Sequence, residues 1–161
     1  HPEADRVLVL MGSGGETARE TVAFLQARGE PVGVAQVRLY RPFPGRALAQ
    51  ALPPTVRRVA VLDRTKEPGS VGEPLFLDVL AALSDAHADG EREPMDSVIG
   101  GRYGLSSKEF TPGMVAGVLE ELGREQPRRR FTIGITDDVS GTSVTGTPMG
   151  STSSSTWSPR R

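Results

Sequence analysis

The sequence predicts an α/β fold in which helices cover both faces of a mostly parallel five-stranded sheet. Two observations predict it. Short apolar runs of strand length alternate with segments of helical periodicity, which is typical of parallel sheets built from strand–helix–strand units. The first apolar run, at 7–11, is continuous rather than alternating, as expected for a strand buried on both faces. We therefore expect a three-layer α/β/α sandwich.

Glycine and proline divide the first half of the chain into elements. The first apolar run ends in Gly12-Ser13-Gly14-Gly15, and Ser13 with Glu16 fits a capping box at the start of a helix. Gly29 is a suitable C-terminal end for that helix, which we expect to reach Arg28. The further elements expected are strands over 32–40 and 56–62 and a short helix over 45–52.

Two prolines mark helix starts in the second half. Pro74 and Pro112 each suit the first helical turn, where a backbone N–H is not needed, and Thr111 is a suitable N-cap. Apolar side chains recur at helical spacing after both prolines, and Gly123 fits the end of the second helix. A weak fourth strand is expected over 97–99 and a fifth over 131–135.

The length of 161 residues suits one domain and a tail. We expect the domain to occupy residues 1–143. The remaining residues, 144–161, are mainly Thr, Gly, Ser and Pro with a single Trp157, and they carry too little apolar surface to offset the entropy of ordering. We therefore predict a disordered Ser/Thr-rich tail over 144–161.

Composition excludes several functional classes. The chain has no cysteine, so it offers no disulfide, no Cys-based zinc site, no iron–sulfur ligand and no Cys nucleophile. The two histidines, His1 and His87, are too far apart in sequence to suggest a metal site. Nineteen basic residues balance twenty acidic ones, which argues against nucleic acid as a partner. Without a signal peptide or a membrane-spanning run, we expect a cytoplasmic protein with no membrane contact.

The first candidate site follows the third strand, because ligands of parallel sheets bind at the carboxyl ends of strands. Four charged residues gather there: Asp63, Arg64, Lys66 and Glu67. Lysine is rare in this chain, and only Lys66 and Lys108 interrupt an otherwise all-arginine set of basic residues. A functional surface and a merely solvated loop are both open at this point.

The second candidate site follows the fourth strand, over 100–110. Its glycines allow another surface to approach the backbone closely. Arg102 offers a forked donor, Tyr103 a ring for stacking, and Lys108 is the second lysine. The alternative is a structural loop whose Tyr103 packs on its own domain.

Three weaker patterns favour structural roles. The glycines at 12–15 suggest dinucleotide binding, but Thr17 stands where a third small residue is needed, and Arg38 and Arg41 stand where an acidic residue would hold a ribose. A tight turn before a helix is the simpler interpretation. Asp137-Asp138 fits a turn or strand-end cap better than a magnesium site. The basic run at 128–130 fits a solvated segment.

Several long motifs in one order resemble the pyruvate:ferredoxin (flavodoxin) oxidoreductase family. The similarity is collinear over about residues 5–143 and falls in the domain that is similar to the carboxy-terminal domain of transketolase (domain II). The stretches that carry it are VLVLMGSG at 7–14, ET at 16–17, VRLYRPF at 37–43, AVLDRTKEPG at 60–69, GEPL at 72–75, GGRYGL at 100–105, SKEFTP at 107–112, GI at 134–135 and DDV at 137–139.

The resemblance implies a role within a larger enzyme. Members of this family decarboxylate pyruvate on thiamine diphosphate with Mg²⁺, form acetyl-coenzyme A, and pass electrons through iron–sulfur clusters to ferredoxin or flavodoxin. The chain lacks the parts that would supply the thiamine-site acid and the clusters. We therefore expect it to be inactive alone, to hold no cofactor or metal itself, to contain no catalytic residue, and to pack against the remaining domains and a second subunit of a homodimer.

In that context the two loops are expected to face neighbouring domains or the active-site cleft. The residues expected to do so are Asp63, Arg64, Lys66, Glu67, Arg102, Tyr103 and Lys108. Two other classes of function remain open: a stand-alone non-catalytic interaction module, and a nucleotide-binding α/β domain, against which Thr17 and Arg38 argue.

Overall fold

A single sheet runs through the computed structural model, which describes residues 1–135, 138–139 and 141–149. The strand order is β2-β1-β3-β4-β5-β6, and every neighbouring pair is parallel. The strands are β1 (Arg6–Met11), β2 (Val32–Val37), β3 (Arg58–Asp63), β4 (Ser97–Arg102), β5 (Arg130–Ile133) and β6 (Ser143–Val144). The predicted parallel sheet is confirmed, with one short strand more than the five expected.

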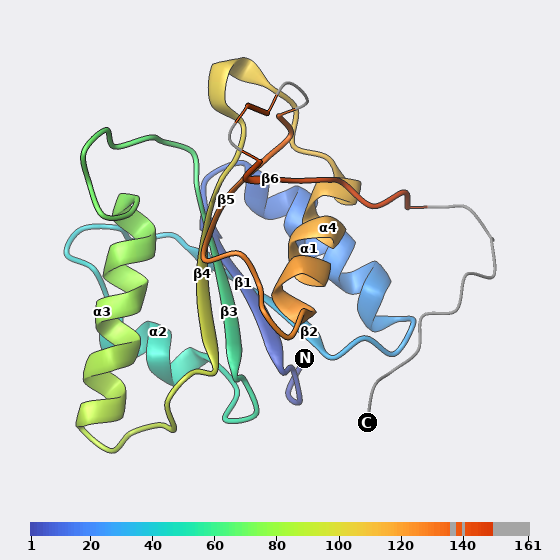
Figure 1. The fold of residues 1–161 in the computed structure, drawn as a ribbon. Helices are drawn as coiled ribbons and strands as arrows, with labels where there is room; N and C mark the ends of the chain where they lie inside the picture. Colours follow the sequence, from blue (N-terminus) through green and yellow to red (C-terminus); the bar gives the residue numbers. More distant parts are fainter. Residues whose placement is uncertain (136–137, 140, 150–161) are drawn as a thin grey trace.

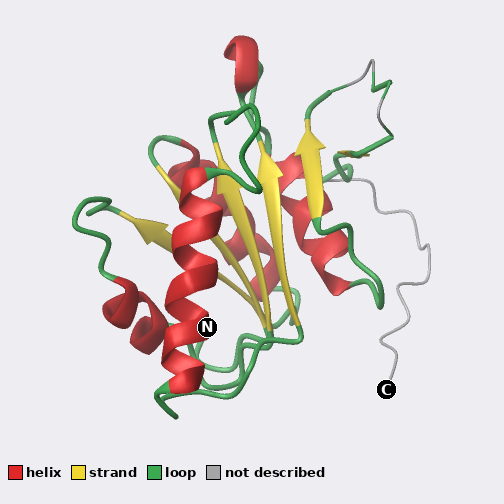
Figure 2. Ribbon diagram, turned by 60° about the vertical axis from the view of Figure 1, so that its left-hand side comes forward, coloured by secondary structure: helices red, strands yellow, loops and turns green. Residues whose placement is uncertain are grey.

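Helices cover both faces of the sheet, which confirms the predicted three layers (Figures 1 and 2). The helices α1 and α4 lie on one face, and α2 and α3 lie on the other. Their bounds are α1 (Gly14–Gln26), α2 (Gly45–Ala51), α3 (Pro74–Ala88) and α4 (Pro112–Gly123), and a short 3₁₀ helix, η1 (Leu105–Ser107), follows β4.

The continuous apolar run of β1 is explained by burial on both faces. Leu8 and Leu10 pack in the core formed with α1 and α4, whereas Val7 and Val9 pack in the core formed with α2 and α3. Successive side chains of a strand point to opposite faces, so a central strand between two helical layers requires apolar residues at every position.

Two of the predicted helix starts are confirmed, and the predicted cap of a third helix is not formed. Pro74 and Pro112 occupy the first turns of α3 and α4, and the Thr111 hydroxyl accepts a hydrogen bond from the Met114 amide at 3.3 Å. The predicted capping box at Ser13 is wrong. Ser13 already has helical backbone angles and makes no side-chain cap, and Glu16 forms an ion pair with Arg19 instead.

The ends of two segments differ from expectation. Strand β2 ends at Val37 rather than at residue 40. Val144, assigned from composition to a tail, pairs with Ile133 in the sheet and is only 6% exposed. Residues 150–161 of that expected tail lie outside the described residues. No helix in the described part of the chain is long and apolar enough to cross a bilayer.

Candidate functional site

Two loops meet at the carboxyl edge of the sheet, the upper edge in Figure 1, where η1 projects beyond the strands. The β3–α3 loop comprises residues 64–73, and the β4–α4 loop comprises residues 103–111. They leave neighbouring strands at the same level, because Asp63 and Arg102 are register partners at the ends of β3 and β4. This register brings together the two candidate segments that the sequence identified separately.

Asp63 differs from its predicted role, because it lies inside the domain. Its side chain belongs to the buried last residue of β3, with 1% of the residue exposed. The two carboxylate oxygens accept hydrogen bonds from the amides of Leu75 (2.9 Å) and Phe76 (3.0 Å), the first turn of α3. Burial raises the pKa of Asp63, and the two amide bonds oppose that rise. Asp63 therefore caps a helix rather than faces a cleft.

Tyr103 also packs on its own domain, which was the alternative left open by the sequence. The residue is 3% exposed, and its hydroxyl donates to the Met11 carbonyl at 3.2 Å. Its ring lies against Phe110, with 4.4 Å between the ring centroids. Burial raises the pKa of the Tyr103 phenol. Gly14 makes room for this ring, because a Cβ there would lie 2.8 Å from the phenol oxygen.

Arg64 connects three segments at this edge. Its Nε donates to the Gly104 carbonyl at 3.2 Å, which ties the β3–α3 loop to the β4–α4 loop. Its Nη1 reaches the Ser13 hydroxyl at 3.5 Å, at the start of α1. Gly104 has a positive φ of 61°, a conformation that favours glycine. Arg64 thus holds the edge together from its solvent side.

Glu73 is a site residue that sequence reasoning missed. It is 5% exposed, its Oε2 accepts a hydrogen bond from the Glu67 amide at 2.7 Å, and its Oε1 pairs with Arg102 Nε. Arg102 is consequently occupied by a partner within the domain. The sequence did contain an indication of this role. Glutamate is not among the residues preferred at an N-cap, so a Glu directly before a helix-starting proline points to a side-chain interaction other than capping.

Four of the predicted site residues remain exposed: Arg64, Lys66, Glu67 and Lys108. Among the residues that the structure describes, the side chains of Lys66 and Lys108 take part in no hydrogen bond or ion pair. An exposed ammonium group without a protein partner is solvated by water, so it carries no desolvation penalty. It remains available to an acidic partner. The edge therefore combines a fixed framework with free cationic side chains.

The glycine turn at 12–15 is filled by side chains of the domain. A Cβ on Gly15 would lie 2.3 Å from the Gln36 amide nitrogen, which itself donates to the Gly12 carbonyl at 3.0 Å. With Tyr103 against Gly14, the glycines serve close packing. These contacts support the tight-turn interpretation over dinucleotide binding.

The remaining charged patterns have structural partners. The Asp138 carboxylate accepts from the Ser143 amide ahead of β6, as a turn residue does, whereas Asp137 lies outside the described residues. Arg128 and Arg129 of the basic run are exposed, as predicted, although the Arg128 amide donates to buried Glu121 at 2.9 Å and the half-buried Arg130 stacks over the Phe76 ring at 3.9 Å.

Within the described residues, no cluster of three or more His, Cys, Asp or Glu side chains is arranged to hold a metal ion.

Comparisons with known proteins agree with the fold. A family model described as pyruvate:ferredoxin oxidoreductase core domain II matches residues 4–105. The chain is 57% identical over 146 residues to the pyruvate-flavodoxin oxidoreductase of Rhodospirillum rubrum. The alignment covers 89% of this chain and 12% of that protein. It is 62% identical over 141 residues to a pyruvate-flavodoxin oxidoreductase of Nostoc sp., covering 88% of this chain and 34% of that one.

A third relative is the pyruvate:ferredoxin oxidoreductase of Moorella thermoacetica, 51% identical over 143 residues, which covers 89% of this chain and 12% of that protein. The chain thus spans 12% of the length of the Rhodospirillum and Moorella relatives.

Proposed function

This chain belongs to the pyruvate:ferredoxin oxidoreductase core domain II family, and from that premise we propose that it serves as one non-catalytic domain of a larger oxidoreductase. The reaction we propose for that enzyme is the oxidative decarboxylation of pyruvate to acetyl-coenzyme A and CO₂, with electrons passing to ferredoxin or flavodoxin. The support is the identity of 51–62% to relatives whose names carry this substrate and these acceptors.

Within that enzyme, the carboxyl edge of the sheet docks against a neighbouring domain or the second subunit of a homodimer and helps to shape the active-site cleft. One observation carries this proposal. Lys66 and Lys108 project unpaired from two loops whose backbones are tied together by Arg64, so the domain presents charge on a fixed frame. Fixed charges at a contact favour one partner orientation over others.

The cofactors of the proposed enzyme belong to other domains. Two observations support this assignment: the chain has no cysteine to bind an iron–sulfur cluster, and, within the described residues, the glycine turn of α1 that could receive a phosphate is filled by Tyr103 and Gln36. Coenzyme A is a substrate of the whole enzyme. We place the enzyme in the cytoplasm.

A chimera tests the proposal. Residues 1–149 of this chain replace the aligned segment of the Rhodospirillum rubrum relative, and reduction of flavodoxin is followed with pyruvate and coenzyme A. We expect an active chimera, and we expect Lys66→Ala to lower turnover about fivefold, the effect of losing one well-placed contact. Arg46→Ala is the matched control, because Arg46 lies on α2 with 77% of its side chain exposed.

Two outcomes would overturn the proposal. Unchanged turnover, coenzyme A dependence and dimer stability in both Lys66→Ala and Arg102→Ala chimeras would show that the edge is not a docking surface. A chimera that assembles but reduces no flavodoxin would favour the alternative of a non-catalytic interaction module.

A further inference from the structure

We propose that Glu73 is a positioning residue that fixes the β3–α3 loop and the β4–α4 loop relative to each other, so that both dock as one surface. The inference rests on the proposed docking function of this edge.

Glu73 is not needed to start its own helix. It occupies the N-cap position of α3, but its side chain makes no cap hydrogen bond. The amides of Leu75 and Phe76 are already satisfied by both oxygens of Asp63. A second carboxylate at the same helix start is therefore free for another task.

The carboxylate of Glu73 instead connects the β3–α3 loop to the end of β4. One oxygen accepts from the Glu67 amide at 2.7 Å, within the β3–α3 loop, and the other pairs with Arg102, from which the β4–α4 loop departs. Burying a carboxylate costs free energy unless it is paired and hydrogen-bonded. Glu73 is 5% exposed, so its burial is tolerated only while the β3–α3 loop and the end of β4, from which the β4–α4 loop departs, keep this arrangement.

Further contacts extend this frame across the β3–α3 loop. Arg130 donates to the Val71 carbonyl at 3.1 Å, and the Ser70 amide donates to the Glu67 carbonyl at 3.2 Å. Although its carbonyl is held in this way, the Val71 residue is 82% exposed. An apolar side chain on a fixed backbone, in the same loop as the unpaired Lys66, fits an apolar surface with an acidic rim.

The β4–α4 loop carries backbone strain that needs such support. Ser106 and Ser107 have φ values of 54° and 58°, although neither is a glycine. This region is unfavourable for residues other than glycine, and such conformations persist only where surrounding contacts determine them. Arg64 on Gly104 and Glu73 on Arg102 supply contacts from the β3 side.

The chain has no cysteine, which makes a direct test simple. Nitroxide labels on Lys66→Cys and Lys108→Cys report the distance between the two loops by pulsed electron resonance in the 161-residue chain. We expect one narrow distance distribution, which Glu73→Gln roughly doubles in width, because a single amide oxygen cannot serve both loops. Arg102→Lys, a milder variant at an accessible position, is expected to broaden it in the same direction.

Glu121→Gln is the matched control. Glu121 is also a buried carboxylate, 2% exposed, that accepts a backbone amide (Arg128, 2.9 Å) and pairs with an arginine (Arg124, 3.2 Å), but it lies on α4 and serves neither loop. Its variant should lose stability and keep the narrow distribution. A narrow distribution in Arg102→Lys and Glu73→Gln, or equal broadening in Glu121→Gln, would overturn the proposal.

The outcome is separable from the docking function. Broadened distances with full turnover of the Glu73→Gln chimera would refute docking at this edge and leave the positioning role intact. Unaltered distances would refute the positioning role whatever the chimera does.

Discussion

Two carboxylates border the β3–α3 loop, and their surroundings give them different tasks. Asp63 lies at the end of β3 with both oxygens on the positive N-terminal end of α3. Glu73 lies at the start of α3 and turns toward the loops. The same functional group therefore fixes a helix in one position and a surface in the other.

Asp63→Asn should lower the free energy of unfolding at neutral pH by about 2 kcal/mol. The carboxamide keeps one acceptor but places an NH₂ group against the second amide donor, which leaves a buried donor unsatisfied. Urea titrations of the 161-residue chain measure the loss. A change comparable to that of an exposed substitution such as Arg46→Ala would show that the cap is not formed.

The free energy of unfolding should depend on pH differently in the wild-type chain and in Asp63→Asn. Because burial raises the pKa of Asp63 above its ordinary value of 3.8, the folded chain binds this proton more tightly than the unfolded chain. The part of the Asp63 contribution that depends on the bound proton is then fully present below pH 3.8 and is lost as pH rises through the folded pKa, whereas the two amide hydrogen bonds remain at neutral pH. The stability difference between wild type and Asp63→Asn should widen on acidification. If the stability difference became smaller on acidification, the two amide hydrogen bonds would affect the pKa of Asp63 more than burial does.

The residue scale is also where prediction from sequence reached its limit. Both predicted loops do follow the carboxyl ends of strands β3 and β4, and their role as a docking surface stays a prediction. The rule that sites lie at carboxyl ends of strands could not tell Asp63, which belongs to the buried strand end, from Lys66, which lies in the exposed loop. Side-chain direction at a strand end depends on where the strand stops, and this boundary depends on tertiary pairing that local sequence does not encode.

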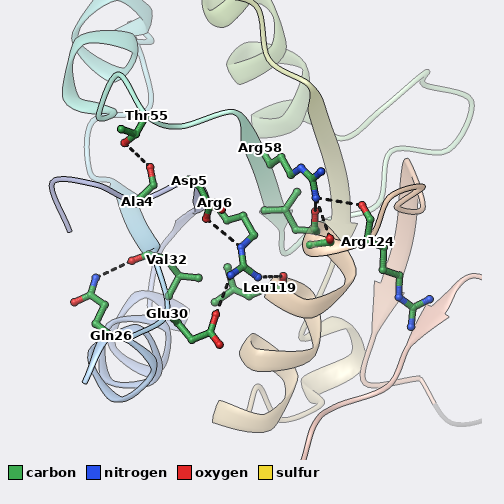
Figure 3. Close-up of polar contacts among 12 residues, drawn as sticks. Ala4, Asp5, Arg6, Gln26, Glu30, Val32, Thr55, Arg58, Leu119 and Arg124 are labelled. Carbon is green, nitrogen blue, oxygen red and sulfur yellow. Dashed lines mark hydrogen bonds and ion pairs between the residues drawn. The ribbon is translucent and has the colours of Figure 1, made fainter. Parts of the chain in front are cut away.

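At the scale of elements, arginines hold helix ends at the amino edge of the sheet. Arg6 donates to the Leu119 carbonyl at 3.3 Å and Arg58 donates to the Gly123 carbonyl at 2.9 Å, both near the end of α4 (Figure 3). Arg92 likewise binds backbone carbonyls at the end of α2 and in the segment that follows it. Its guanidinium donates to the carbonyls of Ala49, Leu52, Pro53 and Val56. Cations at helix C-termini satisfy carbonyls that have no partner in the helix and complement the helix dipole.

Arg92→Met should lower the free energy of unfolding by about 2 kcal/mol, because methionine fills similar space but donates no hydrogen bond to the carbonyls that end α2. Arg46→Met, on α2 itself, should change the free energy of unfolding by less than about 0.5 kcal/mol, since 77% of the Arg46 side chain is exposed and, within the described residues, its one ion pair is with Glu91. Urea unfolding of both variants gives the comparison. Equal effects would mean that solvent replaces the Arg92 contacts without cost.

Helices were predicted better than their caps. Apolar periodicity and proline located α3 and α4, because burying one helical face is a signal spread over many residues. The capping box at Ser13 rested on two residues, and a local alternative, the pairing of Glu16 with Arg19, took its place. Strand β6 was missed because its two residues bring only Val144 to the core.

At the scale of the molecule, the segment at 143–149 joins the domain through glycines of α4. The Thr147 amide donates to the Gly113 carbonyl at 2.8 Å. A Cβ on Gly117 would lie 2.3 Å from the Thr145 carbonyl oxygen, so the segment lies directly on the helix backbone. This contact and the burial of Val144 indicate that the folded unit extends past residue 143, the boundary that composition suggested.

Gly117→Ala tests whether the folded unit extends past residue 143. The test compares the sign of the change in the free energy of unfolding in a shorter and a longer chain. In a chain ended after Thr142, alanine should raise the free energy of unfolding by about 1 kcal/mol, because glycine is unfavourable inside a helix. In the 161-residue chain, the new Cβ displaces Thr145 and the strand that carries Val144, and stability should fall by about 1 kcal/mol. Thermal and urea unfolding of the four proteins measure both changes. The same sign in both lengths would mean that the segment does not pack on α4 in solution, and the domain would then end before β6.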